Sequence, residues 1–375
     1  MGELIKGYYA EKGFTSAGAG TFTWCIATRD GKNYFLKQFL SPVLVSEESK
    51  EKLPPSMVSS MQKSCVEFVA KKKRLYSVLQ RIQTGAFIVP EDMTVYNGHY
   101  LAVSEAITQK CSSDQISSFA PWYKVMLMRT LVLCLMTLSE NHIVHSDIKL
   151  DNLMITEDGC GTPMLKLIDF DSSFFEDDPP LNPNDFHGDQ VYFAPEAMVF
   201  QNSEGSSDVR LNCKMDQFAL GLVLHQMWCG TLPVYNTDKY ANVAEALLLD
   251  DRITFASSLP PRLNRIISGF VKLDSDERMS YREAYALLGE ELSMWEQPFV
   301  PSEDDTDSPK KAQSRTKKVW MCILFAVFFF VGLNPFLSDQ WQWINDTAKA
   351  VCTILLVVSG IGFFGVIFHT FKGKK

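Results

Sequence analysis

The sequence has little positive charge for its size, and this argues against a nucleic-acid-binding protein. Its 375 residues include 36 Lys and Arg against 44 Asp and Glu, a formal net charge of −8. Without the tail from residue 319 onward, which holds four lysines and two aspartates, 32 basic and 42 acidic residues remain, a net charge of −10. Nucleic-acid binding requires a basic face, so we expect no nucleic-acid partner.

The cysteines lack the spacing of a metal site. Nine are present, an odd number, and none forms a Cys-x-x-Cys pair. Most lie in apolar runs, which favours buried free thiols in a reducing compartment over disulfides or structural zinc. The N-terminus lacks the apolar core of a signal peptide. Lys6 stands where a myristoylation signal has Ser or Thr, so we do not expect that modification.

One stretch, residues 145–153, combines three side chains that phosphoryl transfer needs. It reads His-Ser-Asp-Ile-Lys-Leu-Asp-Asn-Leu. In a tight loop, Asp147 can accept a hydroxyl proton, Lys149 can neutralise a transferring phosphoryl group, and Asn152 can hold a divalent cation. Catalysis of this reaction is mostly positioning and charge stabilisation. The stretch resembles the catalytic loop His-Arg-Asp-Leu-Lys-x-x-Asn of eukaryotic-type protein kinases, with Ser146 at the Arg position.

The N-terminal region contains a match to the glycine-rich turn of that family. Residues 18–25 follow Gly-x-Gly-x-x-Gly-x-Val, with Thr23 at the third Gly and Cys25 at the Val. Two small residues allow backbone N–H groups to approach phosphates. The resemblance implies that Gly18, Gly20 and Cys25 contact ATP, although an ordinary hairpin turn has the same pattern.

A lysine is the candidate for binding the phosphates, and a glutamate is the candidate for pairing with that lysine. Residues 34–39 alternate as a strand does, with Lys37 as the candidate phosphate-binding lysine and Phe35 where related kinases usually have Ala. Residues 61–83 then have the apolar spacing of a helix. Glu67, in its first half, is our choice for the acid that pairs with Lys37; a solvated surface glutamate is the alternative.

The middle of the chain predicts the junction between two lobes. Residues 87–90 and 100–103 have the composition of strands, and Ser-Glu-Ala at 104–106 resembles the kinase hinge. The resemblance implies that the backbone of Glu105 and Ala106 hydrogen-bonds adenine. Residues 122–138 are almost wholly apolar but too short and too interrupted by charge for a membrane span. They predict a buried helix in the larger lobe.

A second acidic motif completes the predicted metal site. Asp169-Phe170-Asp171 follows a predicted strand and resembles Asp-Phe-Gly, with Asp171 at the Gly position. A carboxylate at a strand end is well placed to bind Mg²⁺. The resemblance therefore implies that Asp169 and Asn152 hold the metal. It also makes His145 a structural residue beneath the loop rather than a general base.

The remaining family parts follow in order. Residues 188–196 resemble Gly-Thr-x-x-Tyr-x-Ala-Pro-Glu, with Asp189 at the Thr position and Glu196 at the end. Asp216 opens a long apolar helix, and Arg278 is expected to pair with Glu196. These three structural residues favour protein substrates, and the Lys two residues after Asp147 is typical of the Ser/Thr class.

Ser146 and the acidic segment at 172–186 predict how activity is controlled. An Arg at position 146 would bind a phosphorylated segment through a bidentate ion pair, which Ser cannot form. The segment already contains Glu176-Asp177-Asp178. We therefore expect activity that does not depend on phosphorylation of this segment.

The tail predicts a transmembrane hairpin. Residues 319–337 contain no charge and residues 350–371 only a His, and both are near the length that spans a bilayer. A charged linker at 299–318 precedes them, an external loop at 338–349 separates them, and a basic tail at 372–375 follows. Basic residues flank both outer ends, so the positive-inside rule places the N-terminal part and the C-terminus in the cytosol. An amphipathic or buried apolar tail is the alternative.

Together these features predict an α+β, bilobal kinase-like domain at residues 1–298 followed by two transmembrane helices. The small β-rich lobe is expected at about 1–104, the hinge at 104–107 and the helical lobe at about 108–298. The resemblance implies ATP and Mg²⁺, with Mn²⁺ as an alternative metal, and transfer of the γ-phosphate to protein Ser or Thr. The expected partners are protein substrates and the lipid bilayer, with lateral membrane partners left open.

Two other functional classes are compatible with the sequence. Thr23, Phe35 and Asp171 depart from the family pattern and favour a catalytically weak or inactive membrane scaffold with a kinase fold. A membrane-perturbing or channel-like hairpin is a third class, but the few polar residues in the predicted spans favour simple anchoring. The residues with direct chemical roles are all present and favour an enzyme: Lys37, Asp147, Asn152 and Asp169.

Overall fold

The computed structural model describes residues 2–17, 22–82, 84–109, 111–203 and 209–296. The chain divides into two units, Met1–Phe299 and Val300–Lys375, and the described residues all lie in the first. Gly18, Gly20, the predicted linker and the predicted hairpin lie outside the described residues.

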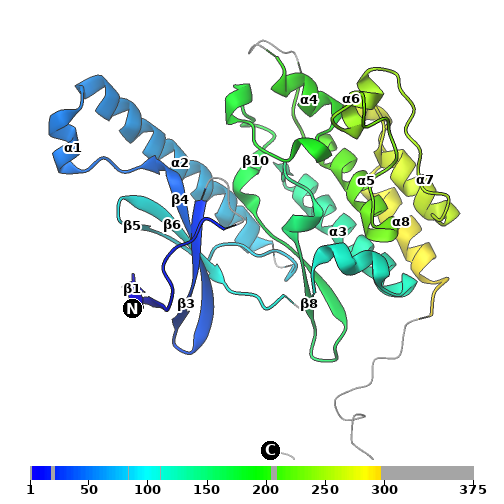
Figure 1. The fold of residues 1–375 in the computed structure, drawn as a ribbon, viewed down its shortest axis with the longest axis horizontal. Helices are drawn as coiled ribbons and strands as arrows, with labels where there is room; N and C mark the ends of the chain where they lie inside the picture. Colours follow the sequence, from blue (N-terminus) through cyan, green and yellow to red (C-terminus); the bar gives the residue numbers. More distant parts are fainter. Residues whose placement is uncertain (1, 18–21, 83, 110, 204–208, 297–375) are drawn as a thin grey trace, which may run out of the picture. The chain divides into compact units, whose positions relative to one another are not determined.

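The small lobe is a six-stranded antiparallel sheet, on the left of Figure 1. Its strand order is β1-β2-β3-β4-β6-β5. The bounds are β1 (Glu3–Ile5), β2 (Tyr8–Ala10), β3 (Phe22–Arg29), β4 (Lys32–Val43), β5 (Asp92–Tyr96) and β6 (His99–Glu105). The turn between β3 and β4 has both Asp30 and Gly31 at positive φ, 51° and 76°, as the hairpin turns that suit twisted strands require.

The strand expected at 87–90 is wrong. Residues 92–96 form β5 beside β6, whereas Phe87 makes an isolated parallel bridge to Leu167 of the large lobe. The signal for β5 was Asn97-Gly98, whose φ values of 48° and 78° fit a two-residue hairpin turn. The apolar run at 87–90 lies between the lobes instead of in the sheet.

The two faces of the sheet have different neighbours. In the β3–β4 register Cys25 lies opposite Leu36, and both belong to a core beneath β1 and β2 that includes Ile5 and Tyr8. The next pair along, Trp24 and Lys37, points to the other face. That face carries a second core formed with helix α2 (Pro55–Arg81).

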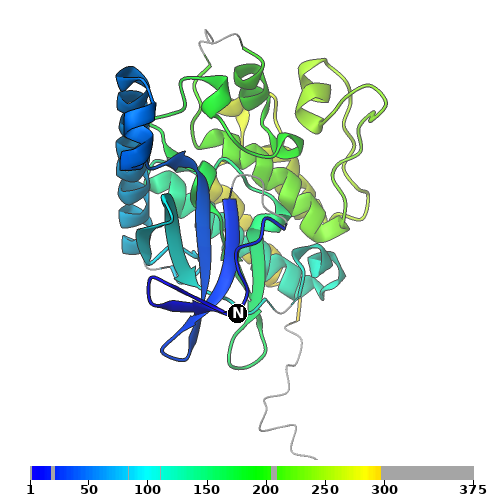
Figure 2. The same ribbon diagram turned by 60° about the vertical axis from the view of Figure 1, so that its left-hand side comes forward.

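Helix α2 covers one side of the sheet, and Figure 2 shows it along the sheet's edge. It follows the short helix α1 (Glu47–Lys52) and begins six residues before the predicted start, with Pro55 in its first turn. Proline suits that position because its missing N–H needs no partner there. Its buried residues recur at helical spacing: Cys65, Lys72, Leu75, Tyr76 and Leu79.

The large lobe, on the right of Figure 1, is mainly helical. Its helices are α3 (Pro121–Glu140), α4 (Pro195–Gln201), α5 (Lys214–Cys229), α6 (Val243–Leu248), α7 (Pro261–Phe270) and α8 (Tyr281–Leu292). Its strands form two pairs, β7 (Ile143–Val144) with β10 (Phe174–Phe175), and β8 (Leu153–Glu157) with β9 (Pro163–Leu167). Short 3-10 helices lie at Ser113–Ser118, Leu150–Asn152, Phe170–Ser172, Pro183–Asp185, Gln190–Tyr192 and Ser275–Glu277.

Helices α3 and α5 form the centre of this lobe, and twelve of the sixteen residues of α5 are buried. Among the described residues, α3 is the helix long and apolar enough to cross a membrane, but half of its most apolar window is buried inside the lobe. Helix α3 packs against α5 and α8. The expected two-lobe arrangement is therefore confirmed.

Candidate active site

The loop after β7 is fixed from below by α5. Asp216, 3% exposed, accepts the backbone N–H of His145 at 2.7 Å and that of Ser146 at 3.0 Å. Ser146 has φ of 71°, a left-handed conformation that costs energy for a residue other than glycine. Burial raises the pKa of Asp216 to about 7 against the lowering effect of the two N–H groups. The strained loop is thus held by one buried side chain.

Three side chains converge above this anchor. The Asn152 amide nitrogen donates to the Asp147 carboxylate at 2.8 Å and to its backbone carbonyl at 2.7 Å. The Lys149 ammonium lies 3.1 Å from the same carboxylate. Burial lowers the pKa of Lys149, but the carboxylates of Asp147 and Asp189 outweigh it, so the pKa is raised. A base, a cation and an amide oxygen therefore share one small volume.

His145 lies wholly buried beneath the loop. Its Nε2 is 3.2 Å from the carbonyl of Ile168, and its ring centroid is 5.0 Å from that of Phe170. Burial lowers the pKa of His145. A neutral ring that donates from Nε2 to a carbonyl links the loop to the end of β9.

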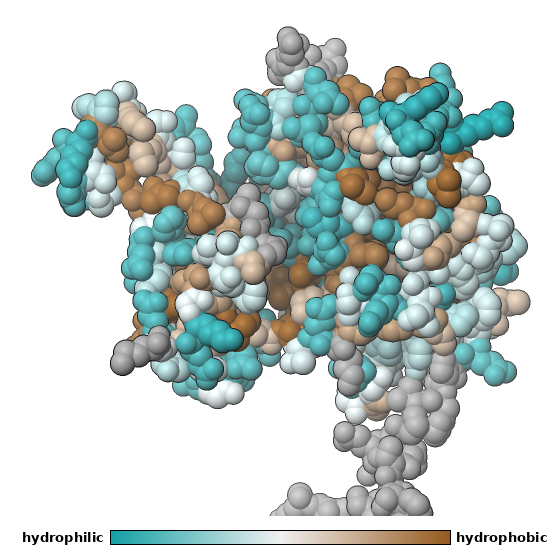
Figure 3. Space-filling view, viewed as in Figure 1, coloured by the Kyte–Doolittle hydropathy of each residue, from teal (hydrophilic) through white to brown (hydrophobic). Residues whose placement is uncertain are grey.

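Lys37 of β4 reaches across to the large lobe. Its Nζ lies 2.9 Å from Asp169 and 2.5 Å from Asp171, and its side chain is 12% exposed. Burial lowers the pKa of Lys37, but Asp171 and Asp169 outweigh it and raise the pKa. Figure 3 shows the surface hollowed between the two lobes. Lys37 of the small lobe is thus paired with Asp169 and Asp171 of the large lobe.

Glu67 does not reach Lys37, which corrects the predicted pair. Its side chain is 58% exposed, and its nearest cation is Lys63, 3.8 Å away on the same helix. The cause is helical phase: the buried stripe of α2 passes through Cys65 and Lys72 and leaves Glu67 outside it. Lys72 occupies the inward position instead.

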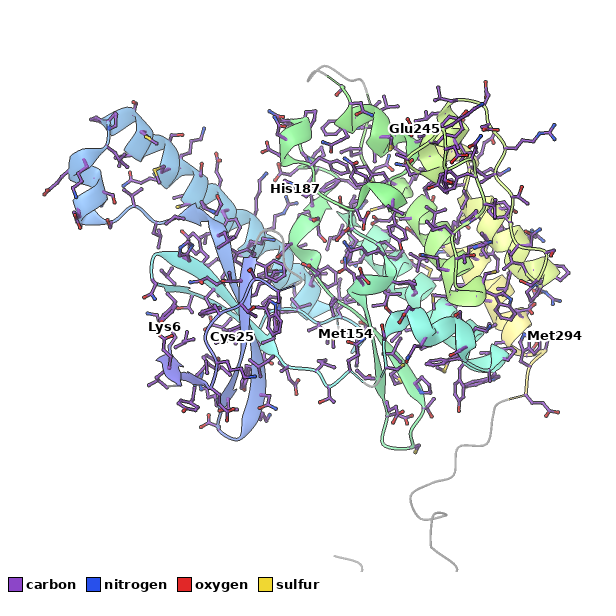
Figure 4. The ribbon with its side chains drawn as sticks, viewed as in Figure 1. Lys6, Cys25, Met154, His187, Glu245 and Met294 are labelled. Atoms are coloured by element: carbon purple, nitrogen blue, oxygen red, sulfur yellow. The ribbon has the colours of Figure 1, made fainter. Side chains whose placement is uncertain are left out.

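Two predicted adenine contacts also need correction. Cys25 lies in the core on the face opposite Lys37, 3% exposed, and Figure 4 labels it within the sheet. Trp24 and Phe35 are among the residues that share the face of Lys37, and their rings stack at 5.5 Å. The Ala106 N–H, expected to bond adenine, donates to the Asn33 carbonyl at 3.0 Å.

Glu105 ends β6 opposite Tyr34 and is exposed, so it remains at the predicted junction. On the large-lobe side, Met154 of the β8–β9 hairpin lies at the edge facing the small lobe (Figure 4).

The segment after Phe170 is docked on both the loop and α2. The Asp189 N–H donates to Asp147 at 2.9 Å, and its carboxylate lies 3.7 Å from Lys149. A Cβ on Gly188 would lie 2.5 Å from the Ser146 carbonyl, so only glycine permits this approach. The next residue upstream, His187, is labelled in Figure 4, and its carbonyl accepts the Ser146 hydroxyl at 2.9 Å.

The acidic part of that segment meets basic residues of α2. Arg74 makes two contacts with the Asp177 carboxylate, 2.9 and 2.8 Å, and its guanidinium lies 3.9 Å from the centroid of the Phe175 ring. Lys71 lies 3.5 Å from Asp178. These carboxylates bind the helix without any phosphate group.

Glu196 and Arg278 form the expected pair. Two guanidinium nitrogens of Arg278 lie 2.5 and 2.7 Å from the two carboxylate oxygens, and the Arg278 side chain is fully buried. The same guanidinium donates to the Lys214 carbonyl at 2.8 Å. Helix α4 is therefore tied to the start of α5.

The oxygen donors fit a hard divalent cation. Among the described residues, no group of three or more His, Cys, Asp or Glu is arranged to hold a metal by itself. The candidate ligands are the Asp169 carboxylate and the amide oxygen of Asn152, and Mg²⁺ usually takes few protein ligands plus phosphate oxygens and water. The site therefore fits Mg²⁺ brought with a nucleotide.

Comparison with known proteins agrees with this geometry. The family model of the protein kinase domain matches residues 56–287, which begin inside α2 and leave Lys37 outside the matched range. RAC-beta serine/threonine-protein kinase of Rattus norvegicus is 32% identical over 149 residues, and that of Homo sapiens is 31% identical over the same length. Each alignment covers 40% of this chain and 28% of the relative. The chain belongs to the protein kinase domain family.

Proposed function

We propose that the protein is a membrane-anchored kinase that transfers the γ-phosphate of ATP to Ser or Thr hydroxyls of proteins. The observation that carries this proposal is the convergence of Asp147, Lys149 and Asn152 on one volume, with Lys37 and Asp169 meeting across the hollow between the lobes. These five residues supply the base, the two cations and the two candidate metal ligands that phosphoryl transfer requires.

Each residue has a distinct task. Asp147 accepts the proton of the attacking hydroxyl, and Lys149, 3.1 Å from it, offsets negative charge on the phosphoryl group. Lys37 contacts the α- and β-phosphates. Asp169 and Asn152 would hold Mg²⁺, which supplies charge neutralisation between phosphates when bound.

Two features support a protein Ser or Thr acceptor. Lys149 beside Asp147 is typical of the Ser/Thr class, and the relatives are named serine/threonine-protein kinases. The buried Glu196–Arg278 pair stabilises the segment below the loop, where a protein acceptor would lie.

A kinase-fold scaffold with little activity is the second candidate. Trp24 and Phe35 stack on the face of Lys37, and Phe35 stands where the family usually has Ala over adenine. This pair reduces the space for a nucleotide base. Nucleotide affinity therefore distinguishes the two candidates.

The experiment is transfer of ³²P from ATP with Mg²⁺ to casein by the purified full chain. We expect label on Ser or Thr, lost at least 100-fold in Asp147→Asn because the base is removed. Asp151→Asn is the matched control, an exposed carboxylate of the same loop that should stay within about twofold of the wild type.

Binding of ADP is measured in parallel. No label together with measurable ADP binding would support the scaffold. Equal label in the wild type and Asp147→Asn would contradict the assigned role of Asp147.

A further inference from the structure

Two residues carry charges that the family pattern does not predict, and they meet in space. Lys72 lies in the middle of the apolar stripe of α2, with its side chain 9% exposed. Asp171 stands where the family has Gly, directly after Phe170. The Lys72 ammonium lies 3.0 Å from both the carboxylate and the backbone carbonyl of Asp171.

The Asp171 carboxylate is shared between two lysines. One oxygen contacts Lys72 at 3.0 Å, and the other contacts Lys37 at 2.5 Å. The three side chains therefore form a chain of alternating charge from β4 to α2.

Aromatic rings lie close to both lysines. The Lys37 ammonium lies 3.7 Å from the centroid of the Phe22 ring. The Lys72 ammonium lies 5.4 Å from Phe39 and 5.9 Å from Phe68 and from Tyr76. Rings hold a cation by its charge and exclude water, so the direction of each ammonium is fixed from more than one side.

We propose that Asp171 and Lys72 are positioning residues for Lys37, and that together they replace the helix glutamate that Glu67 was expected to supply. The inference rests on the proposed kinase function. Asp171 holds Lys37 toward the phosphates, and Lys72 holds Asp171. The polarity of the helix contact is thereby reversed: a lysine of α2 acts through a carboxylate of the large lobe.

The arrangement also resolves a conflict between two carboxylates. Lys37 contacts both Asp169 and Asp171, but Asp169 is the candidate metal ligand. With Asp169 bound to Mg²⁺, Asp171 would still hold Lys37, because Lys72 fixes the position of Asp171.

The test measures the KM for ATP, the KM for casein, kcat and the Kd for Mg-ADP on the purified full chain. The variants are Asp171→Asn, Lys72→Met, the double variant and Lys72→Arg. Lys73→Met is the matched control, an exposed lysine adjacent to Lys72 on the same helix. Melting temperatures identify any variant that fails to fold, and Lys72→Met keeps the test valid if Asp171→Asn unfolds.

We expect Asp171→Asn to raise the KM for ATP and the Kd for Mg-ADP about 10-fold or more, with the KM for casein unchanged. Lys72→Met should act in the same direction by about threefold, whereas Lys72→Arg and Lys73→Met stay within about twofold of the wild type. The double variant should be no worse than Asp171→Asn, because residues that act in series are not additive.

Other outcomes would overturn the inference. A fall in kcat with no change in nucleotide affinity would indicate general destabilisation. Losses in the double variant equal to the product of the single losses would show that the residues act independently. If the wild type binds Mg-ADP but transfers no phosphate, the proposed function fails while the Kd series still tests the positioning role.

Discussion

The Glu176 carboxylate connects the residue before α5 to the turn after α3. One oxygen accepts the Cys213 N–H at 2.9 Å, and the other lies 2.8 Å from Nδ1 of His142. Burial raises the pKa of Glu176, but these hydrogen bonds outweigh it and lower the pKa below its ordinary value of 4.5. A carboxylate with a lowered pKa stabilises the fold above its ordinary pKa, and the stabilisation is lost as the pH falls.

We therefore predict that Glu176→Gln destabilises the protein at pH 7 by about 1 kcal/mol. Gln keeps an oxygen that can accept the Cys213 N–H but lacks the charge. Urea unfolding from pH 7 to pH 3.5 should show the difference from the wild type narrowing below about pH 4.5. A difference that stays constant over this range would mean that the charge of Glu176 contributes nothing.

At the scale of elements, α2 and the acidic segment are joined by carboxylates of the chain itself. Arg74 pairs with Asp177 and Lys71 pairs with Asp178, with each side chain about half exposed or more. Exposed pairs are each worth about 0–1 kcal/mol. Their role is to favour one position of the segment, alongside the buried Lys72–Asp171 contact.

The docking of the acidic segment on α2 through Asp177 and Asp178 predicts activity that does not depend on phosphorylation of that segment. Treatment with a phosphatase should leave kcat/KM within about twofold. Asp177→Asn should lower kcat/KM by no more than about fivefold, and less at high salt, because the pair is exposed. Asp185→Asn neutralises the same segment without touching Arg74 and is the control. Loss of activity on phosphatase treatment, restored by rephosphorylation within the segment, would contradict this prediction.

The elements also show which residues sequence reasoning can locate. Asp147, Lys149 and Asn152 lie within six residues, so any tight loop brings them together, and they were placed from the motif alone. Glu67 and Cys25 were assigned by counting along a pattern, which ignores which face of a helix or strand a residue occupies.

Some of the missing information was nevertheless in the sequence. Lys72 interrupts an apolar helical stripe, and Asp171 replaces a glycine. Each of these two charges would destabilise the fold if it were buried by itself, because burying an unpaired charge is unfavourable. Their opposite signs were the signal that they pair, but 99 residues separate them and only the fold shows the contact.

At the scale of the whole molecule, the proposal of a membrane anchor rests on the sequence after residue 318. Residues 319–337 and 350–371 are apolar enough and long enough to span a bilayer. Basic residues at both outer ends favour cytosolic placement of the kinase domain and the C-terminus.

We predict that the expressed full chain stays in the membrane pellet after extraction at alkaline pH. A variant without residues 319–371 should be released, because a spanning helix binds the bilayer far more strongly than a surface contact does. Protease added to sealed vesicles with the cytosolic side inward should leave the kinase domain intact. Release of the full chain by alkali would contradict the anchor.

The carboxylates that dock the acidic segment have a consequence for the timing of signals. A phosphate group can be removed within seconds by another enzyme, but an aspartate is permanent for the life of the polypeptide. A kinase whose segment is docked through Asp177 and Asp178 has no covalent mark there to erase. If phosphatase treatment leaves its activity unchanged, its output would follow how fast the chain is synthesised and degraded, and which acceptors share its surroundings.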